Sequence, residues 1–160
     1  MAVSGTTTTR NIPVRLKDRS YRLSIGYGHT PSLGAMLKRA DWGNLAVVLT
    51  NPTVRSKAAR QVLASLRQAR IKTQLLTVPD TERSKSMRCL SQLLNQLAGC
   101  VGPGMRPVLV LVGGGVVGDL GGLAAGLYKR GIPYIQVPTT LLAQVDSSIG
   151  GNGEPIGAVL

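Results

Sequence analysis

Residues 108–119 read VLVLVGGGVVGD. The five apolar residues 108–112 are typical of a strand that is covered on both faces of a parallel sheet. Three glycines follow, and Gly113, Gly115 and Gly118 satisfy the pattern G-x-G-x-x-G where a strand gives way to a helix. Because strand, glycine turn and helix make up the start of a βα unit, this stretch predicts an α/β domain with a parallel sheet.

The rest of the chain continues the alternation of strand and helix. Apolar residues alternate with polar ones over residues 12–16 and 21–25, which predicts a hairpin ahead of the parallel sheet. Thr50, Asn51 and Pro52 are typical of a turn, and Met87 begins an apolar helical stripe. We expect further strands at residues 45–49, 73–78 and 134–137, and helices after residue 31, over 56–70, over 84–97, from the glycines to about 128, and after 140. The predicted fold is an α/β, parallel-sheet, Rossmann-like nucleotide-binding domain with an N-terminal β-hairpin.

Length and composition limit the classes of function. The chain has 160 residues, which is the size of one ordinary domain, and 43% of them are hydrophobic. The formal net charge of +12 comes from 19 basic and 7 acidic residues, which favours an anionic partner. Aromatic residues make up only 3%, so the stacking platforms of single-strand binders are missing. We therefore expect an anionic small molecule rather than nucleic acid.

The chain shows no pattern of a membrane, secreted or metal-binding protein. Its longest apolar stretch is broken by glycines, and the Thr-rich start lacks the apolar core of a secretory signal, so we expect a cytoplasmic location with no membrane contact. Cys89 and Cys100 fit neither a disulfide framework nor a zinc pattern. The single histidine, His29, has no second ligand at metal-binding spacing, so we expect no metal site within the chain.

The glycine stretch predicts a phosphate site. Glycines allow the backbone to approach a phosphate closely, and a helix N-terminus offers free N–H groups and a positive dipole end. We expect Gly115 to need a positive φ, which a branched side chain adopts only at a cost. A packing turn between strand and helix is the alternative, and Asp119 could serve only to complement the helix dipole. No acidic residue follows about 20 positions later, so the usual Rossmann arrangement does not apply.

Residues 111–151, LVGGGVVGDLGGLAAGLYKRGIPYIQVPTTLLAQVDSSIGG, closely resemble the signature region of the 3-dehydroquinate synthase family. VPDTERSKS at residues 78–86 resembles the family's acidic, lysine-bearing nucleotide loop. The resemblance implies an NAD- and metal-dependent lyase of the shikimate pathway. Such an enzyme converts DAHP, a phosphorylated sugar acid, into 3-dehydroquinate and phosphate, with zinc or cobalt as the divalent metal.

The resemblance also implies roles for individual residues. For NAD, the implied residues are Gly114, Gly115, Val116, Val117, Gly118 and Asp119 at the pyrophosphate and nearby ribose, Thr139 and Thr140 at the nicotinamide half, and Asp80, Glu82 and Lys85 at the adenosine side. Asn51 stands where the family often has an acidic residue for ribose hydroxyls. Arg130 and Asp146 match positions that face the substrate, although a cation at a helix end and a helix-terminal cap are the alternatives from chemistry alone.

The resemblance ends abruptly after Gly151. Asn152 replaces a substrate-binding lysine of the family, and the family's metal ligands, one glutamate and two histidines, lie in a C-terminal domain. We therefore expect an NAD-binding domain over residues 1–151 and a divergent tail over 152–160, in a truncated and inactive portion of the enzyme. Apolar surface is then expected near residues 121–127 or 141–145, and a homodimer is a further expectation. A related sugar phosphate cyclase, a glycerol-type dehydrogenase and a non-catalytic nucleotide-binding module remain as alternatives.

Overall fold

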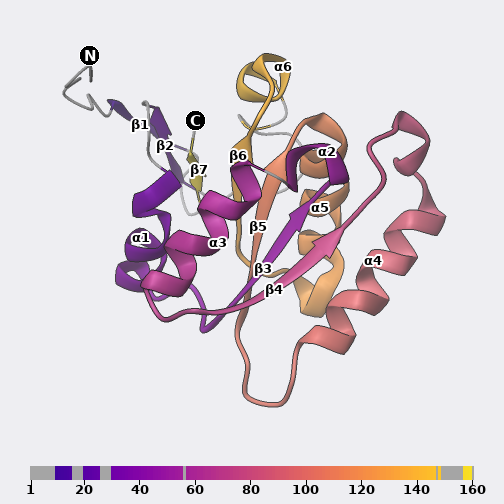
Figure 1. Cartoon of the computed structure of the whole chain (residues 1–160), viewed down its shortest axis with the longest axis horizontal. Helices are drawn as coiled ribbons and strands as arrows, with labels where there is room; N and C mark the ends of the chain where they lie inside the picture. The colour runs from indigo at the N-terminus through magenta and orange to yellow at the C-terminus, as the bar shows by residue number, and fades with distance from the viewer. Residues whose placement is uncertain are drawn as a thin grey trace.

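The described strands form one sheet in the order β1-β2-β7-β6-β5-β3-β4 (Figure 1). The computed structural model describes residues 10–15, 20–25, 30–55, 57–146, 148 and 157–159. The strands are β1 (Arg10–Val14), β2 (Tyr21–Ile25), β3 (Leu45–Thr50), β4 (Lys72–Thr77), β5 (Pro107–Gly113), β6 (Tyr134–Pro138) and β7 (Gly157–Val159). Only β1 and β2 pair antiparallel in this sheet, and the other pairs are parallel. The hairpin and the parallel sheet that the sequence predicts are confirmed.

Helices cover both faces of the sheet (Figure 1). The α-helices are α1 (Leu33–Ala40), α2 (Pro52–Arg55), α3 (Ala58–Gln68), α4 (Met87–Cys100), α5 (Gly115–Leu127) and α6 (Leu141–Val145), and the 3-10 turns are η2 (Thr30–Ser32), η3 (Glu82–Ser84) and η4 (Tyr128–Arg130). Every residue of β3 is buried, and successive side chains point to opposite faces. Leu45, Val47 and Leu49 pack in the core with α4 and α5, whereas Ala46 and Val48 pack in the core with α1 and α3.

The chain changes direction across the sheet between β3 and β5. β3 continues outward to β4 through α2 and α3, while β5 continues the other way to β6 through α5. Because these strands are parallel and in register, their carboxyl ends meet at one edge, where Thr50 is paired with Thr77 and Gly113 with Pro138. In open α/β sheets, ligands bind in the crevice outside the strand ends at such a switch point.

The structure differs from the sequence-based expectation in three places. Asn51 and Pro52 do not form a plain turn, because Pro52 begins α2 and Asn51 caps it. The helix expected over 56–70 is α3, and the short α2 precedes it as a further helix. The segment 157–159, to which the sequence assigned no structure, is a strand between β2 and β6. The connection between the two strands of the expected hairpin, residues 16–19, lies outside the described residues.

Candidate functional site

The glycine loop places the start of α5 at the carboxyl edge of the sheet. Gly114 precedes the helix in an extended conformation, and the Gly118 N–H donates the first helical hydrogen bond, to the Gly114 carbonyl oxygen at 3.1 Å. The N–H groups of Gly115, Val116 and Val117 come before that bond, so the helix itself gives them no acceptor. Such groups, with the positive end of a 13-residue helix dipole, suit an anion.

The three glycines of the loop differ in how much space a side chain would find at each position. A Cβ on Gly113 would lie 2.6 Å from Val117 Cγ2, so Gly113 is required for packing of strand against helix. A Cβ on Gly114 would lie 3.3 Å from Thr140 Cγ2, whereas a Cβ on Gly115 would meet nothing within 4 Å. The expectation of a positive φ at Gly115 is wrong, because among the described glycines only Gly104 and Gly131 have one. Open space over the backbone, not backbone strain, distinguishes Gly115.

Thr139 and Thr140 lie beside this loop but use their hydroxyls differently. The Thr139 N–H donates to the Gly113 carbonyl oxygen at 3.0 Å, which ties the end of β6 to the loop. The Thr139 hydroxyl oxygen is buried and has no hydrogen-bond partner within the described part of the chain. The Thr140 hydroxyl caps α6, because it accepts a hydrogen bond from the Ala143 N–H at 3.2 Å. Thr139 is therefore the threonine with hydrogen-bonding capacity left for a ligand.

An ion cluster joins η3 to α5. Lys85 Nζ lies 2.9 Å from Asp119 Oδ2 and 3.1 Å from Glu82 Oε2. Hydrogen bonds to Asp119 first and Glu82 second raise the pKa of Lys85 above its usual value, so the ammonium stays charged at neutral pH. Asp119 lies beyond the first turn of α5, which contains no acidic residue, so the alternative role of complementing the helix dipole does not account for it.

Asn51 and Asp80 follow the ends of β3 and β4 at the same edge. The Asn51 side chain is 2% exposed, and its Oδ1 accepts a hydrogen bond from the Val54 N–H at 2.8 Å. Because that oxygen caps α2, the carbonyl end of the amide is already used within the fold. Asp80 is exposed in the loop before η3. Asp80 is thus two positions from Glu82 of the ion cluster in the sequence. The Asn51 side chain makes a contact within the fold, as the cap of α2.

Arg130 and Asp146 do not come together in this chain. Asp146 is exposed at the C-cap of α6, and Thr140 beside the glycine loop is the N-cap of the same helix. Arg130 lies beyond the far end of α5, and a 13-residue helix is about 20 Å long. Lys129 and Arg130 both have a positive φ, of 50° and 69°, in an exposed turn before β6. The two residues expected to face one substrate are therefore at opposite edges of the sheet.

A hollow of about 240 Å³ borders the ion cluster. Lys85, Ser86 and Asp119 are its polar lining residues, and apolar side chains of α4 and α5 complete the lining, namely Met87, Leu90, Leu120 and Leu123. Met87 was expected to begin the buried stripe of its helix, but it is 76% exposed. No sequence pattern indicates this hollow, because the apolar residues of α4 that line it are 30 or more positions from those of α5.

Among the residues that the structure describes, no three histidine, cysteine, aspartate or glutamate side chains gather in a way that could hold a metal ion. In the same part of the chain, no helix is long and apolar enough to span a membrane.

Known proteins match this chain both in sequence and in structure. The family model for the N-terminal part of 3-dehydroquinate synthase matches residues 75–154. The 3-dehydroquinate synthase of Pelobacter propionicus is 45% identical over 141 residues, which are 88% of this chain and 39% of that protein. The chain thus spans about two fifths of the length of this relative.

Solved structures show the same fold. A 2-deoxy-scyllo-inosose synthase complexed with carbaglucose-6-phosphate, NAD+ and Co2+ superposes with a TM-score of 0.81 at 22% identity, over 94% of this chain and 45% of the other. The 2-epi-5-epi-valiolone synthase of Streptomyces hygroscopicus, with NAD+ and Zn2+ bound, superposes with a TM-score of 0.72 at 26% identity, over 91% of this chain and 44% of the other.

Proposed function

Because this chain belongs to the 3-dehydroquinate synthase N-terminal family, we propose that it is the NAD-binding portion of an enzyme that converts DAHP into 3-dehydroquinate and phosphate. Its 45% identity to a 3-dehydroquinate synthase favours this reaction over that of the other sugar phosphate cyclases, which it resembles at 22% and 26% identity. The proposed place of the reaction is the shikimate pathway in the cytoplasm.

The observation that carries the proposal is the open space at Gly115 above three N–H groups of α5. Those groups of Gly115, Val116 and Val117 would hold the pyrophosphate of NAD. The buried Thr139 hydroxyl would bond to the nicotinamide half, and the cluster of Lys85, Glu82 and Asp119 to the adenosine side. When bound, NAD takes up a hydride from a substrate hydroxyl carbon and later returns it.

The described residues do not fit the second cofactor of the family, a divalent zinc or cobalt ion. No suitable set of three ligands gathers among them, so no part of the chemistry at a metal is assigned to these residues. Asp146 would accept hydrogen bonds from hydroxyls of the sugar acid.

We propose that this chain alone does not turn over DAHP, and that a phosphate-release assay with NAD and zinc gives only background. Turnover in a preparation free of host enzyme would contradict that.

We also propose that the chain forms a homodimer. Arg130 would then serve the site of a second copy, because it lies about 20 Å from the glycine loop of its own chain. Leu123 and Leu127 are exposed by 47% and 55% on the helix that leads to Arg130, so apolar surface for such a contact is present.

NAD binding is tested by one substitution at two positions of α5. Gly115→Val places a side chain in the open space where the pyrophosphate would approach, and the fold has room for it. Gly126→Val is the matched control, because a Cβ at Gly126 also meets nothing within 4 Å but lies at the far end of the same helix. We expect weak, specific NAD binding by the parent in calorimetry, unchanged binding by Gly126→Val and none by Gly115→Val. Equal binding by all three folded proteins would make the loop a packing turn.

A further inference from the structure

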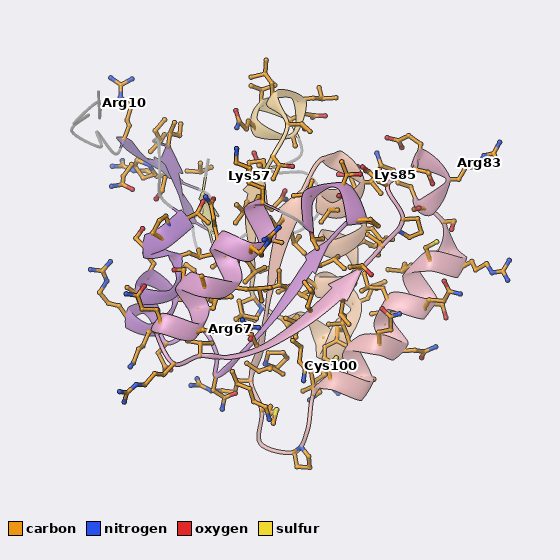
Figure 2. All side chains as sticks on the ribbon, viewed as in Figure 1. Arg10, Lys57, Arg67, Arg83, Lys85 and Cys100 are labelled. Atoms are coloured by element: carbon orange, nitrogen blue, oxygen red, sulfur yellow. The ribbon has the colours of Figure 1, made fainter. Side chains whose placement is uncertain are left out.

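Basic side chains gather where β3 and β4 begin, at the edge of the sheet opposite to the glycine loop. They come from the ends of α1 and α3 and from the start of β4, and all of them are exposed. We call this surface the basic edge, and its members are Lys38, Arg39, Arg67, Arg70 and Lys72. Figure 2 shows Arg67 on this side of the molecule, whereas Lys57 and Arg83 lie in the upper part of the view.

Contacts between the elements make the basic edge one surface. Lys72 is paired with Leu45 at the start of β3, and Leu45 is paired with Pro107 at the start of β5. Because neighbouring strands lie about 4.8 Å apart, the beginnings of these three strands span about 10 Å. The helices α1 and α3 are joined beside them, since the Gly34 N–H donates to the Ser65 hydroxyl oxygen at 2.9 Å.

Carboxylates do not balance the charge of the basic edge. Residues 19–79 contain ten Lys or Arg and a single acidic residue, Asp41. The Asp41 carboxylate is already paired with a further cation, because its Oδ1 lies 2.8 Å from Arg106 Nη2. No ion pair joins a member of the basic edge to another described residue. Helix dipoles account for the cations in the last turns of α1 and α3, but not for Lys72, which begins a strand.

The composition of this surface distinguishes between anionic partners. Protein interfaces centre on apolar and aromatic side chains, and binding at a membrane surface gains from apolar side chains that enter it. However, α1, α3 and β4 contain no aromatic residue, and the large exposed apolar side chains of the described chain lie on other elements. Long cationic side chains without such anchors suit phosphate groups, which arginine binds in a bidentate way.

We propose that the basic edge binds the phosphate backbone of a nucleic-acid duplex, irrespective of base sequence. A duplex carries one negative charge per about 1.7 Å of its axis, so a strip of about 10 Å meets several phosphates. The expectation of no nucleic acid rested on missing platforms for base stacking, which contacts to phosphates do not need. Because the basic edge and the glycine loop lie at opposite edges of the sheet, this inference does not depend on the proposed NAD site.

The salt dependence of binding tests the proposal. Fluorescence anisotropy of labelled RNA and DNA duplexes of mixed sequence, titrated with the full chain, gives the dissociation constant at each salt concentration. If all five cations contact phosphates, the logarithm of affinity should fall against the logarithm of salt with a slope of about −4.5, a several-hundredfold loss between about 50 and 200 mM. Binding of neither duplex at low salt would overturn the proposal.

Two matched triple variants locate the surface. Arg67→Gln, Arg70→Gln and Lys72→Gln together should bring the slope to about −2 and weaken binding at low salt more than tenfold, because about three phosphate contacts are lost. The control carries Lys57→Gln, Arg83→Gln and Arg88→Gln, which removes the same charge from exposed positions where α3, η3 and α4 begin, at the opposite edge.

The control should bind within about threefold of the parent, since its substitutions leave all five phosphate contacts in place. Equal weakening in both triple variants would show an effect of net charge alone and would overturn the assigned surface. Tighter binding of polyglutamate, or of vesicles that contain phosphatidylserine, than of either duplex would overturn the assigned partner. Thermal melting of each variant confirms that the compared proteins are folded.

Discussion

Two threonine hydroxyls are buried at the carboxyl ends of neighbouring strands without a hydrogen-bond partner in the described part of the chain. Thr50 ends β3 and is fully buried, and it shares a face with Val48, which packs in the core with α1 and α3. Thr139 follows β6 and lies beside the glycine loop. A buried hydroxyl without a partner costs stability, because it gives up its hydrogen bonds to water. The described part of the chain offers the Thr50 hydroxyl no compensating hydrogen bond. At Thr139 the proposed ligand would supply that hydrogen bond.

Replacing each threonine with valine should show which of the two hydroxyls contributes to NAD binding. Thr50→Val and Thr139→Val keep the side-chain shape, so each should raise the free energy of unfolding by about 1 kcal/mol and the melting temperature by about 2–4 °C. Only Thr139→Val should weaken NAD binding, because it removes a group that faces the ligand. Thermal melting and calorimetry on both variants check this. Unchanged NAD affinity in Thr139→Val would remove Thr139 from the site.

At the scale of secondary structure, the sequence predicted the elements with a strong hydrophobic period. The fully buried β5 and the amphipathic α3 and α4 follow directly from apolar runs and helical stripes. The start of α2 was missed because an Asn-Pro pair is typical both of a turn and of a helix cap. β7 was missed because a three-residue strand is too short to show a period, and it forms through pairing with β2 and β6.

The candidate site could be predicted only in part, because some of its contacts join residues that are distant in the sequence. The glycine loop was recognised because strand, glycines and helix are adjacent in the sequence. The contact of Lys85 with Asp119 joins residues 34 positions apart, and no spacing rule encodes it. The separation of Arg130 from the loop does follow from sequence, since a helix of this length carries its end about 20 Å away.

The helices α1 and α3 pack closely where Gly34 meets Ser65. The Ser65 hydroxyl donates to the Pro31 carbonyl oxygen at 2.7 Å and accepts from the Gly34 N–H at 2.9 Å. A Cβ on Gly34 would collide with the Ser65 carbonyl oxygen, which is backbone and cannot turn aside. The close approach of the two helices therefore depends on the absence of a side chain at Gly34.

Alanine at two helical glycines should thus have opposite effects. Gly34→Ala should destabilise the chain by roughly 1–3 kcal/mol, because the helices must move apart. Gly99→Ala is the matched control in α4, where a Cβ meets nothing within 4 Å, and it should stabilise the chain by about 0.5–1 kcal/mol through its helix preference. Urea unfolding of both variants gives the comparison. A stable Gly34→Ala protein would show that α1 and α3 are loosely packed.

At the scale of the whole molecule, both α5 and α6 carry several exposed apolar side chains. Leu123 and Leu127 of α5 are exposed by 47% and 55%, and Leu141, Leu142 and Val145 of α6 by 62–76%. This confirms the expectation of open apolar surface near residues 121–127 and 141–145. The net charge of +12 opposes association of two copies, so the apolar contact has to overcome a repulsion that salt screens.

The chain should therefore self-associate at tens of micromolar, and more strongly as salt rises. If the α5 surface forms the proposed homodimer, replacing Leu123 and Leu127 together with Gln should leave a monomer, because the variant loses most of its exposed apolar area on that helix. The matched control replaces Leu141 and Val145 with Gln, which removes similar side chains from α6 and should leave association unchanged. Sedimentation velocity at several protein and salt concentrations measures the mass of each. A monomeric parent would contradict self-association, and loss of association only in the α6 variant would place the contact on α6 and leave Arg130 without a role in a second copy.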